Sequence, residues 1–207
     1  MVTLVVGATN PNARELLAKM FRQRHQVFVE EKGWKLKSYN GLEFDNYDTD
    51  ETVYIMALTP EGEMVASMRM LRTDKPHMMA DVFADMCEGG VPRRADVWEL
   101  TRGALTKGLR ATGYWSRMQC GLIEAALLWG VNKGTGIYTV DYVTALNRAG
   151  WDGRPMGQPR MMDGEPYVAC ECNLTGAVLA RTRALHKITA PVIERIYYMP
   201  EQERRAA

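Results

Sequence analysis

The chain has 207 residues, of which 46% are apolar and 25% are charged, and its formal net charge is +1. This composition predicts a folded protein with a sizeable core, and the balanced charge gives no basic field for a nucleic-acid partner. Because no apolar run reaches membrane-spanning length and the first residues lack a basic leader before a long apolar core, we expect a cytoplasmic protein without membrane association.

The first predicted elements are a short strand and a helix. Residues 2–6 (VTLVV) predict the strand, and Asn10 followed by Pro11 is typical of a helix start. Steps of three and four residues then place one set of side chains on a shared helix face: Leu17, Met20, Phe21, Arg24 and Phe28. Arg24 therefore lies on the apolar side, unless its long side chain extends to the edge of that face.

A β-hairpin follows. Residues 52–58 and 63–71 predict two strands around a turn that contains Pro60 and Gly62. In the second strand, alternation places Val65, Ser67, Arg69 and Leu71 on one face.

The remaining elements alternate between helices and strands. We predict helices at 76–87, 116–134, 143–150 and 175–188, and strands at 95–105, 136–142 and 165–174. This order predicts an α/β fold in one domain, 1–207, with a mixed sheet covered by helices.

No metal site is expected, because the residues that bind metals lack ligand spacing. The cysteines and histidines are scattered, and we expect the thiols to be reduced and structural. They are Cys87, Cys120, Cys170, Cys172, His25, His77 and His186.

Charged residues recur inside apolar segments, which calls for partners because charges are rarely buried alone. They are Arg24, Arg69, Glu99 and Arg102, and Asp45 and Asp48 are the nearest candidate partners. One interpretation is a structural ion-pair network that closes a loop over a sheet. The other is a cleft for a zwitterion, whose carboxylate suits a guanidinium and whose ammonium suits a carboxylate. Phe28 and Trp34 would attract a cationic or planar ligand group.

In order and spacing, these residues resemble the acyl-homoserine-lactone synthase (autoinducer synthase) family. The resemblance rests on Arg24, Phe28, Trp34, Asp45 and Asp48 in "EFDNYD", Arg69 in "SMRML", and Glu99 and Arg102 in "WELTR". Phe83 in "DVF", "RAGW" at 148–151 and "MGQP" at 156–159 support it, so the match extends from about residue 20 to 160.

The resemblance implies a single-domain α/β/α sandwich with a mixed, splayed sheet, related to the N-acetyltransferase (GNAT) fold. It implies two substrates, S-adenosyl-L-methionine and an acyl thioester on coenzyme A or acyl carrier protein, and no tightly bound cofactor. The methionine amine would attack the thioester, and its carboxylate would then close a lactone and expel 5′-methylthioadenosine. Residues 1–70 would form the S-adenosylmethionine-binding half and residues 95–190 the acyl-chain half.

The resemblance also implies residue roles. We expect Asp45 to hold the ammonium, and Glu99 to accept its proton or to pair with Arg102 or Arg69. Asp48 would form a structural ion-pair network with Arg69 and Arg102. The expected catalytic residues are Glu99, Asp45 and Arg102, and the expected S-adenosylmethionine contacts are Arg24, Phe28, Trp34, Asp45, Arg69, Phe83 and Thr101.

The acyl group should lie against the helix at 118–129 and the strand at 136–142. The candidates are Met118, Leu122, Ala125, Ala126, Tyr138 and Tyr142, which would otherwise be ordinary core. Aromatic residues there favour a short, branched or aryl acid. A basic face for acyl carrier protein or coenzyme A phosphates would comprise Lys107, Arg110, Arg117, Lys133, Arg148 and Arg154. The "DNYDTDETVYIMAL" stretch resembles the coenzyme A-using branch.

Two alternatives stay open. A coenzyme A-dependent N-acetyltransferase would bind pyrophosphate at a glycine-containing turn. "TKGLRATG" has Gly108 and Gly113 there but not the full pattern. A regulatory domain that binds a small molecule is the other alternative.

The alternation of side chains along a strand gives one further prediction. Glu99 and Arg102 are three residues apart and would face opposite ways in a regular strand. We therefore predict a break, such as a β-bulge, between them.

Overall fold

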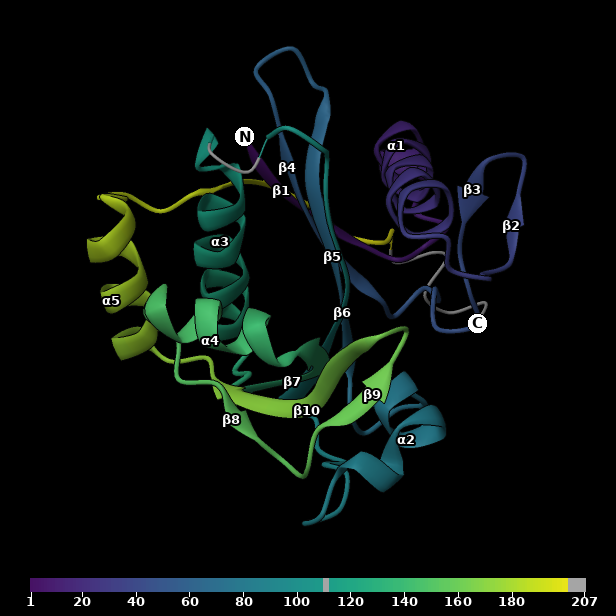
Figure 1. The fold of residues 1–207 in the computed structure, drawn as a ribbon. Coiled ribbons are helices and arrows are strands. Elements are labelled where there is room, and N and C mark those ends of the chain that lie inside the picture. Colours follow the sequence, from purple (N-terminus) through teal and green to yellow (C-terminus); the bar gives the residue numbers. More distant parts are fainter. Residues whose placement is uncertain (110–111, 201–207) are drawn as a thin grey trace. The chain divides into compact units, whose positions relative to one another are not determined.

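The computed structural model describes residues 1–109 and 112–200 (Figure 1). The chain forms two compact units. Unit 1 comprises residues 1–70, residues 102–121 and the described residues from Val192 onward. Unit 2 comprises residues 71–101 and 122–191. None of the helices in the described part of the chain is long and apolar enough to cross a membrane.

The sheet of unit 1 is built around its first strand. Strand β1 (Val2–Val6) pairs antiparallel with β4 (Val53–Leu58) and parallel with β11 (Ile193–Tyr197). Strand β4 pairs antiparallel with β5 (Met64–Arg72), which confirms the predicted hairpin. The chain after β6 (Val97–Leu105) lies against the start of β5, because the Thr106 N–H donates to the Val65 carbonyl at 2.8 Å. Strand β11 was not predicted.

Helix α1 (Arg14–Arg24) packs against this sheet. The Asn10 side chain accepts the Asn12 N–H and so begins a short 3-10 turn, Pro11–Ala13, which leads into α1. Leu17 and Met20 pack against strand residues in one core cluster. The predicted helix start is thus confirmed. A π-helical segment, His25–Glu31, follows, and β2 (Ser38–Tyr39) and β3 (Leu42–Glu43) form a small separate hairpin.

Unit 2 contains a second run of paired strands. Strand β7 (Lys133–Thr139) pairs in parallel with the start of β6 and antiparallel with β10 (Glu165–Asn173). The short strands β8 (Arg154–Pro155) and β9 (Arg160–Met162) both pair with β10.

Helices cover both faces of the β7–β10 pair (Figure 1). Helix α2 (Met78–Val82) packs toward Ala169, whereas α4 (Val140–Arg148) packs toward Val168 and Cys170. Neighbouring strand residues point to opposite faces, so these two helices lie on opposite sides. Helix α3 (Tyr114–Leu128) contributes residues to both units, and α5 (Gly176–His186) belongs to unit 2.

Two predicted boundaries are wrong. The helix predicted for 116–134 ends at Leu128, because Gly130 adopts a left-handed φ of +70° and the Val131 N–H bonds back to the Ala126 carbonyl. The strand predicted for 136–142 ends at Thr139, whose side chain accepts the Tyr142 N–H and so caps helix α4. Residues 140–142 are therefore helical.

Candidate active site

The acidic loop after β3 in unit 1 is fixed by its own hydrogen bonds. The Tyr47 N–H donates to Asp45 Oδ1 at 2.9 Å, and the Asp45 N–H donates to Asp48 Oδ2 at 2.8 Å. The Thr52 hydroxyl donates to the Tyr47 carbonyl at 2.7 Å. Such side-chain-to-backbone bonds are typical of Asx turns, and they set the two carboxylates in place before any ligand arrives.

Asp48 is the buried anchor of this loop. Its two oxygens accept hydrogen bonds from both terminal nitrogens of Arg24, at 2.8 and 3.0 Å, and the Tyr54 hydroxyl donates to Oδ1 at 2.9 Å. Burial by itself raises the pKa of Asp48, but the charges of Arg24 and Arg69 outweigh it and lower the pKa to about 2. Asp48 is therefore ionised at neutral pH.

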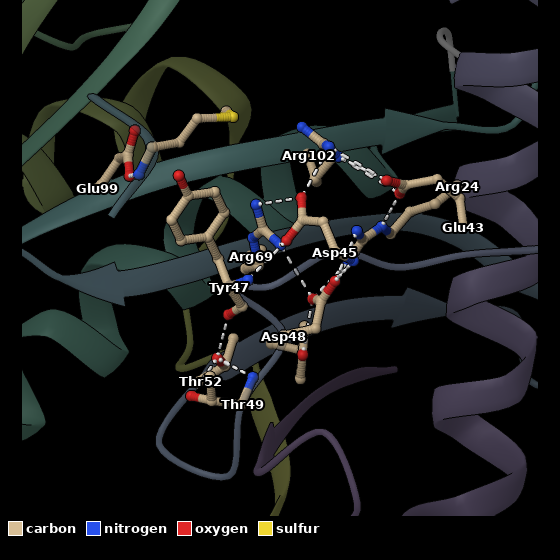
Figure 2. Close-up of polar contacts among 12 residues, drawn as sticks. Arg24, Glu43, Asp45, Tyr47, Asp48, Thr49, Thr52, Arg69, Glu99 and Arg102 are labelled. Carbon is tan, nitrogen blue, oxygen red and sulfur yellow. Dashed lines mark hydrogen bonds and ion pairs between the residues drawn. The ribbon is translucent and has the colours of Figure 1, made fainter. Parts of the chain in front are cut away.

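Asp45 lies at the exposed end of the same group. Arg69 donates hydrogen bonds to both of its oxygens, at 2.5 and 3.1 Å, and Arg102 Nη2 donates to Oδ2 at 2.8 Å (Figure 2). Arg69 also lies 3.1 Å from Asp48 Oδ1. Asp48 is 2% exposed, whereas Asp45 is 23% exposed. Asp45 is therefore the carboxylate that a ligand can approach.

Glu43 is bonded to both Arg24 and Arg102. Its Oε2 is 2.6 Å from Arg24 Nε, and its Oε1 is 3.2 Å from Arg102 Nε. Sequence reasoning did not include Glu43 among the site residues. The signal that could have found it was its two-residue spacing from Asp45, which places both carboxylates on one side of an extended chain.

We call the whole group the ion-pair cluster. Its three arginines and three carboxylates balance in charge, and its members are Arg24, Glu43, Asp45, Asp48, Arg69 and Arg102. Arg24 is only 1% exposed, so its side chain does not extend to the edge of the helix face. The expected pairing of Asp48 with Arg69 is present at 3.1 Å, while the bidentate partner of Asp48 is Arg24 and that of Arg69 is Asp45.

The backbone of β6 is irregular at Arg102, and the β-bulge between Glu99 and Arg102 stays a prediction. Arg102 has a φ of +53°, in the left-handed region that a non-glycine residue rarely adopts in a strand. A left-handed residue of this kind interrupts the regular alternation of side chains along a strand.

An aromatic pair lies in the same unit. Phe28, on the π-helical segment, and Trp34 stack with ring centroids 5.1 Å apart and an interplanar angle of 13°. The Lys32 ammonium is 4.9 Å from the Trp34 ring, and the Arg102 guanidinium is 5.8 Å from the Phe28 ring. These rings therefore already attract cations through their faces.

Glu99, in unit 2, is held by the start of a helix. Its two oxygens accept the backbone N–H groups of Met78 and Met79, at 2.9 and 2.8 Å, and its side chain is fully buried. Exposed N–H groups at a helix start favour a carboxylate. This contact was not predicted. Phe83 packs in the cluster beneath α2, and Thr101 is buried.

The predicted acyl-pocket residues are divided between the units. Met118 belongs to unit 1, and the others to unit 2; the four on α3 are buried. The basic residues are divided in the same way. Lys107 and Arg117 are in unit 1, and Lys133, Arg148 and Arg154 are in unit 2, where Lys133 pairs with Glu171 at 2.9 Å. Arg110 lies outside the described residues.

Comparison with known proteins decides the family. Residues 9–176 match the family described as Autoinducer synthase. The chain belongs to this family. An acyl-homoserine-lactone synthase of Ralstonia nicotianae is 34% identical over 172 residues, which cover 79% of this chain and 84% of that protein. An isovaleryl-homoserine lactone synthase of Bradyrhizobium diazoefficiens is 31% identical over 162 residues, which cover 76% and 73%.

Solved structures agree with this autoinducer synthase assignment. BjaI, a coenzyme A-dependent acyl-homoserine lactone synthase solved with S-adenosylmethionine and isopentyl-coenzyme A, matches with a TM-score of 0.87 at 25% identity. The match covers 100% of this chain and 98% of that one. A putative N-acetyltransferase from Lactobacillus plantarum matches in fold alone, with a TM-score of 0.57 at 23% identity. The mixed α/β fold related to N-acetyltransferases is confirmed, and so is the enzyme class, an acyltransferase that makes a quorum-sensing signal.

Proposed function

We propose that this autoinducer synthase acylates S-adenosylmethionine with an acyl-coenzyme A and then closes the lactone. In the first step the methionine amine forms a bond to the thioester carbonyl carbon, the carbon–sulfur bond breaks, and the thiol leaves. In the second step a carboxylate oxygen of the same methionine bonds to its γ-carbon. The bond to the sulfonium sulfur breaks, and neutral 5′-methylthioadenosine leaves. The product is an N-acyl-L-homoserine lactone.

The exposure of Asp45 is the observation that carries this proposal. The other two carboxylates of the ion-pair cluster, Glu43 and Asp48, are buried, but Asp45 presents one edge to solvent. An ammonium group can reach that edge and complete the carboxylate's hydrogen bonds. We assign the amine of S-adenosylmethionine to this position.

The arginines then divide into two roles. Arg24 and Arg69 are the most enclosed, and we assign them to positioning Asp48 and Asp45. Arg102 is 7% exposed, so its guanidinium is the best placed of the three to attract the methionine carboxylate. The sulfonium is already a good leaving group, so lactone closure mainly needs this carboxylate held near the γ-carbon. Positioning of this kind supplies on the order of 7–11 kcal/mol in well-oriented systems.

We assign the sulfonium and adenosyl group to the stacked Phe28–Trp34 pair. The Lys32 ammonium lies over the Trp34 face, and we assign the sulfonium to the place that this ammonium takes in the chain without substrate. Burial of Phe28 against Val27 and Ala104 fixes the pair.

We assign Glu99 as the general base that takes the proton from the amine. The Met78 and Met79 N–H groups hold the carboxylate in a fixed orientation, and a positioned carboxylate can accept the amine proton directly or through one water. We further propose that unit 1 holds S-adenosylmethionine and that the candidates on α3, β7 and α4 hold the acyl chain, with Phe83 and Thr101 as additional contacts. Because both substrates are made in the cytoplasm, we propose that the enzyme works there.

The proposal also names the acyl donor, which is acyl-coenzyme A. The BjaI structure is described as coenzyme A-dependent and matches over the whole of this chain, which supports acyl-coenzyme A rather than acyl carrier protein as donor.

The test measures methylthioadenosine release from S-adenosylmethionine by the purified full chain, with acyl-coenzyme A, with acyl carrier protein loaded with the same acyl groups, and without a thioester. We expect release only with a thioester, and faster release with coenzyme A. Release without a thioester, or acetylation of amines that are not S-adenosylmethionine, would contradict the proposal. Faster release with the carrier protein would overturn the donor assignment alone.

A further inference from the structure

The parallel ladder between β6 and β7 in unit 2 stops early. Its pairs are Val97 with Lys133, Trp98 with Gly134 and Glu99 with Thr135, although β7 continues to Thr139. At the next residue of β6, Leu100, the carbonyl oxygen accepts a hydrogen bond from the Tyr138 hydroxyl at 3.2 Å. A side chain therefore occupies the place where the two backbones part.

Gly136 makes this contact sterically possible. A Cβ at residue 136 would lie 2.4 Å from the Tyr138 hydroxyl oxygen and 2.5 Å from the ring carbon that bears it. The same Cβ would lie 2.8 Å from the Leu100 carbonyl oxygen. These separations are far below van der Waals contact, so the phenol ring folds back over residue 136 only because that residue is glycine.

The ring is also blocked from behind. Its centroid lies 5.4 Å from that of Tyr142, and it packs against the cluster of Val143, Val168 and Cys170. Burial raises the pKa of the Tyr138 hydroxyl well above its usual value, and the nearby charge of Glu99 adds to this effect. The phenol thus stays protonated and keeps its hydrogen bond to Leu100, close to the proposed base.

We infer that Tyr138, folded over Gly136 onto the Leu100 carbonyl, is the residue that limits the length of the acyl group. This inference rests on the proposed function. An acyl chain that extends along β6 beyond Glu99 meets the phenol ring, which packs against Tyr142 and against the cluster of Val143, Val168 and Cys170. Short or branched acyl thioesters fit in front of the ring, whereas a long chain needs the volume that the ring fills. The class of substrate is therefore a short or branched acyl-coenzyme A.

The experiment compares kcat/KM for isovaleryl-, butyryl-, octanoyl- and decanoyl-coenzyme A, with methylthioadenosine release as the readout. We expect the wild-type protein to prefer the two short donors. Tyr138→Ala should raise the ratio of kcat/KM for octanoyl- to butyryl-coenzyme A by about tenfold or more. The reason is that a pocket with room for one more methylene of the substrate discriminates by about that factor. Gly136→Ala keeps the phenol but displaces it, so it should move the ratio in the same direction. Tyr138→Phe keeps the ring and should keep the short-chain preference.

Controls separate a length limit from general damage. Tyr167→Ala removes a phenol from a different cluster on β10, and the octanoyl-to-butyryl ratio should stay at the wild-type value. Thermal unfolding of each variant shows whether it folds, and Tyr138→Leu replaces Tyr138→Ala if the latter does not. A wild-type preference for octanoyl or decanoyl, or an unchanged ratio in folded Tyr138→Ala or Tyr138→Leu, would overturn the inference. Absence of methylthioadenosine with every wild-type donor would instead overturn the proposed function.

Discussion

Arg24 and Asp48 form a bidentate ion pair that is closed to solvent on both sides, with N–O distances of 2.8 and 3.0 Å and exposures of 1% and 2%. The pair joins helix α1 to the acidic loop through two fixed hydrogen bonds. A buried pair of this kind adds little net stability by itself, because desolvation offsets the attraction. Its loss is costly, because the charge that remains is buried and keeps only part of its compensation, such as the Arg69 contact of Asp48 at 3.1 Å.

Arg24→Met should lower the free energy of unfolding by about 3–5 kcal/mol. The matched control is Arg22→Met on the exposed side of the same helix, which should change it by less than about 0.5 kcal/mol. Denaturant unfolding measures both. The double variant Arg24→Met/Asp48→Leu should recover part of the loss, because neither charge is then left alone. Equal stability of the two single variants would show that the buried pair has no structural role.

Acid should destabilise the protein through Asp48. Its pKa is about 2 in the folded chain, below the ordinary value of 3.8 that the unfolded chain has, so the folded value is depressed. The stabilisation is fully present above about pH 4 and is lost as the pH falls toward 2, amounting to about 2 kcal/mol. Unfolding measured from pH 6 to pH 2 should show this loss, and the slope should be smaller in Asp48→Asn. An identical slope in that variant would assign the acid sensitivity to other carboxylates.

Asp45→Asn should weaken S-adenosylmethionine binding by about ten- to a hundredfold, since a hydrogen bond to a charged group contributes about 1.5–3 kcal/mol. Its loss of stability should be smaller than that of Asp48→Asn, because Asp45 is partly exposed. Isothermal titration gives the affinity. Asp50→Asn, in the same loop and bonded to Thr9, is the control and should bind normally. Normal binding by Asp45→Asn would remove Asp45 from the ammonium site.

Glu99→Gln should lower kcat by about a hundredfold or more if Glu99 takes the amine proton. It should also cost about 1–3 kcal/mol of stability, because the new NH₂ group faces an N–H donor of α2. The pH dependence of kcat separates the two effects, since a base gives a limb on the acidic side that the variant lacks. Glu88→Gln, an exposed substitution in unit 2, should change neither quantity. A pH profile unchanged in shape would leave Glu99 with a positioning role only.

Local patterns in the sequence predicted several elements of the fold and the burial of one charged residue. Helical periodicity placed Arg24 on the buried face, and the turn at Pro60 and Gly62 predicted the β4–β5 hairpin. The ends of α3 and β7 were missed, although Gly130 and Thr139 carry ordinary stop and cap signals.

Contacts between distant segments were beyond such patterns. The pairing of β11 with β1 joins the two ends of the chain, and Glu99 meets an α2 that lies 20 residues earlier. Glu43 bonds Arg102 across 59 residues. None of these leaves a local periodicity, so single-sequence reasoning predicted that charged residues need partners without specifying every partner.

The left-handed backbone at Arg102 has a consequence for how this sequence can change. An L-residue in that conformation costs about 1–2 kcal/mol, and glycine would relieve the cost. Glycine there would remove the guanidinium that bonds Glu43 and Asp45. The relief is smaller than the about 3–5 kcal/mol that is lost when a buried charge loses its partner, because Glu43 would stay buried without Arg102. Selection for a stable fold and selection for signal production therefore both keep the strained arginine, and position 102 tolerates glycine in neither case.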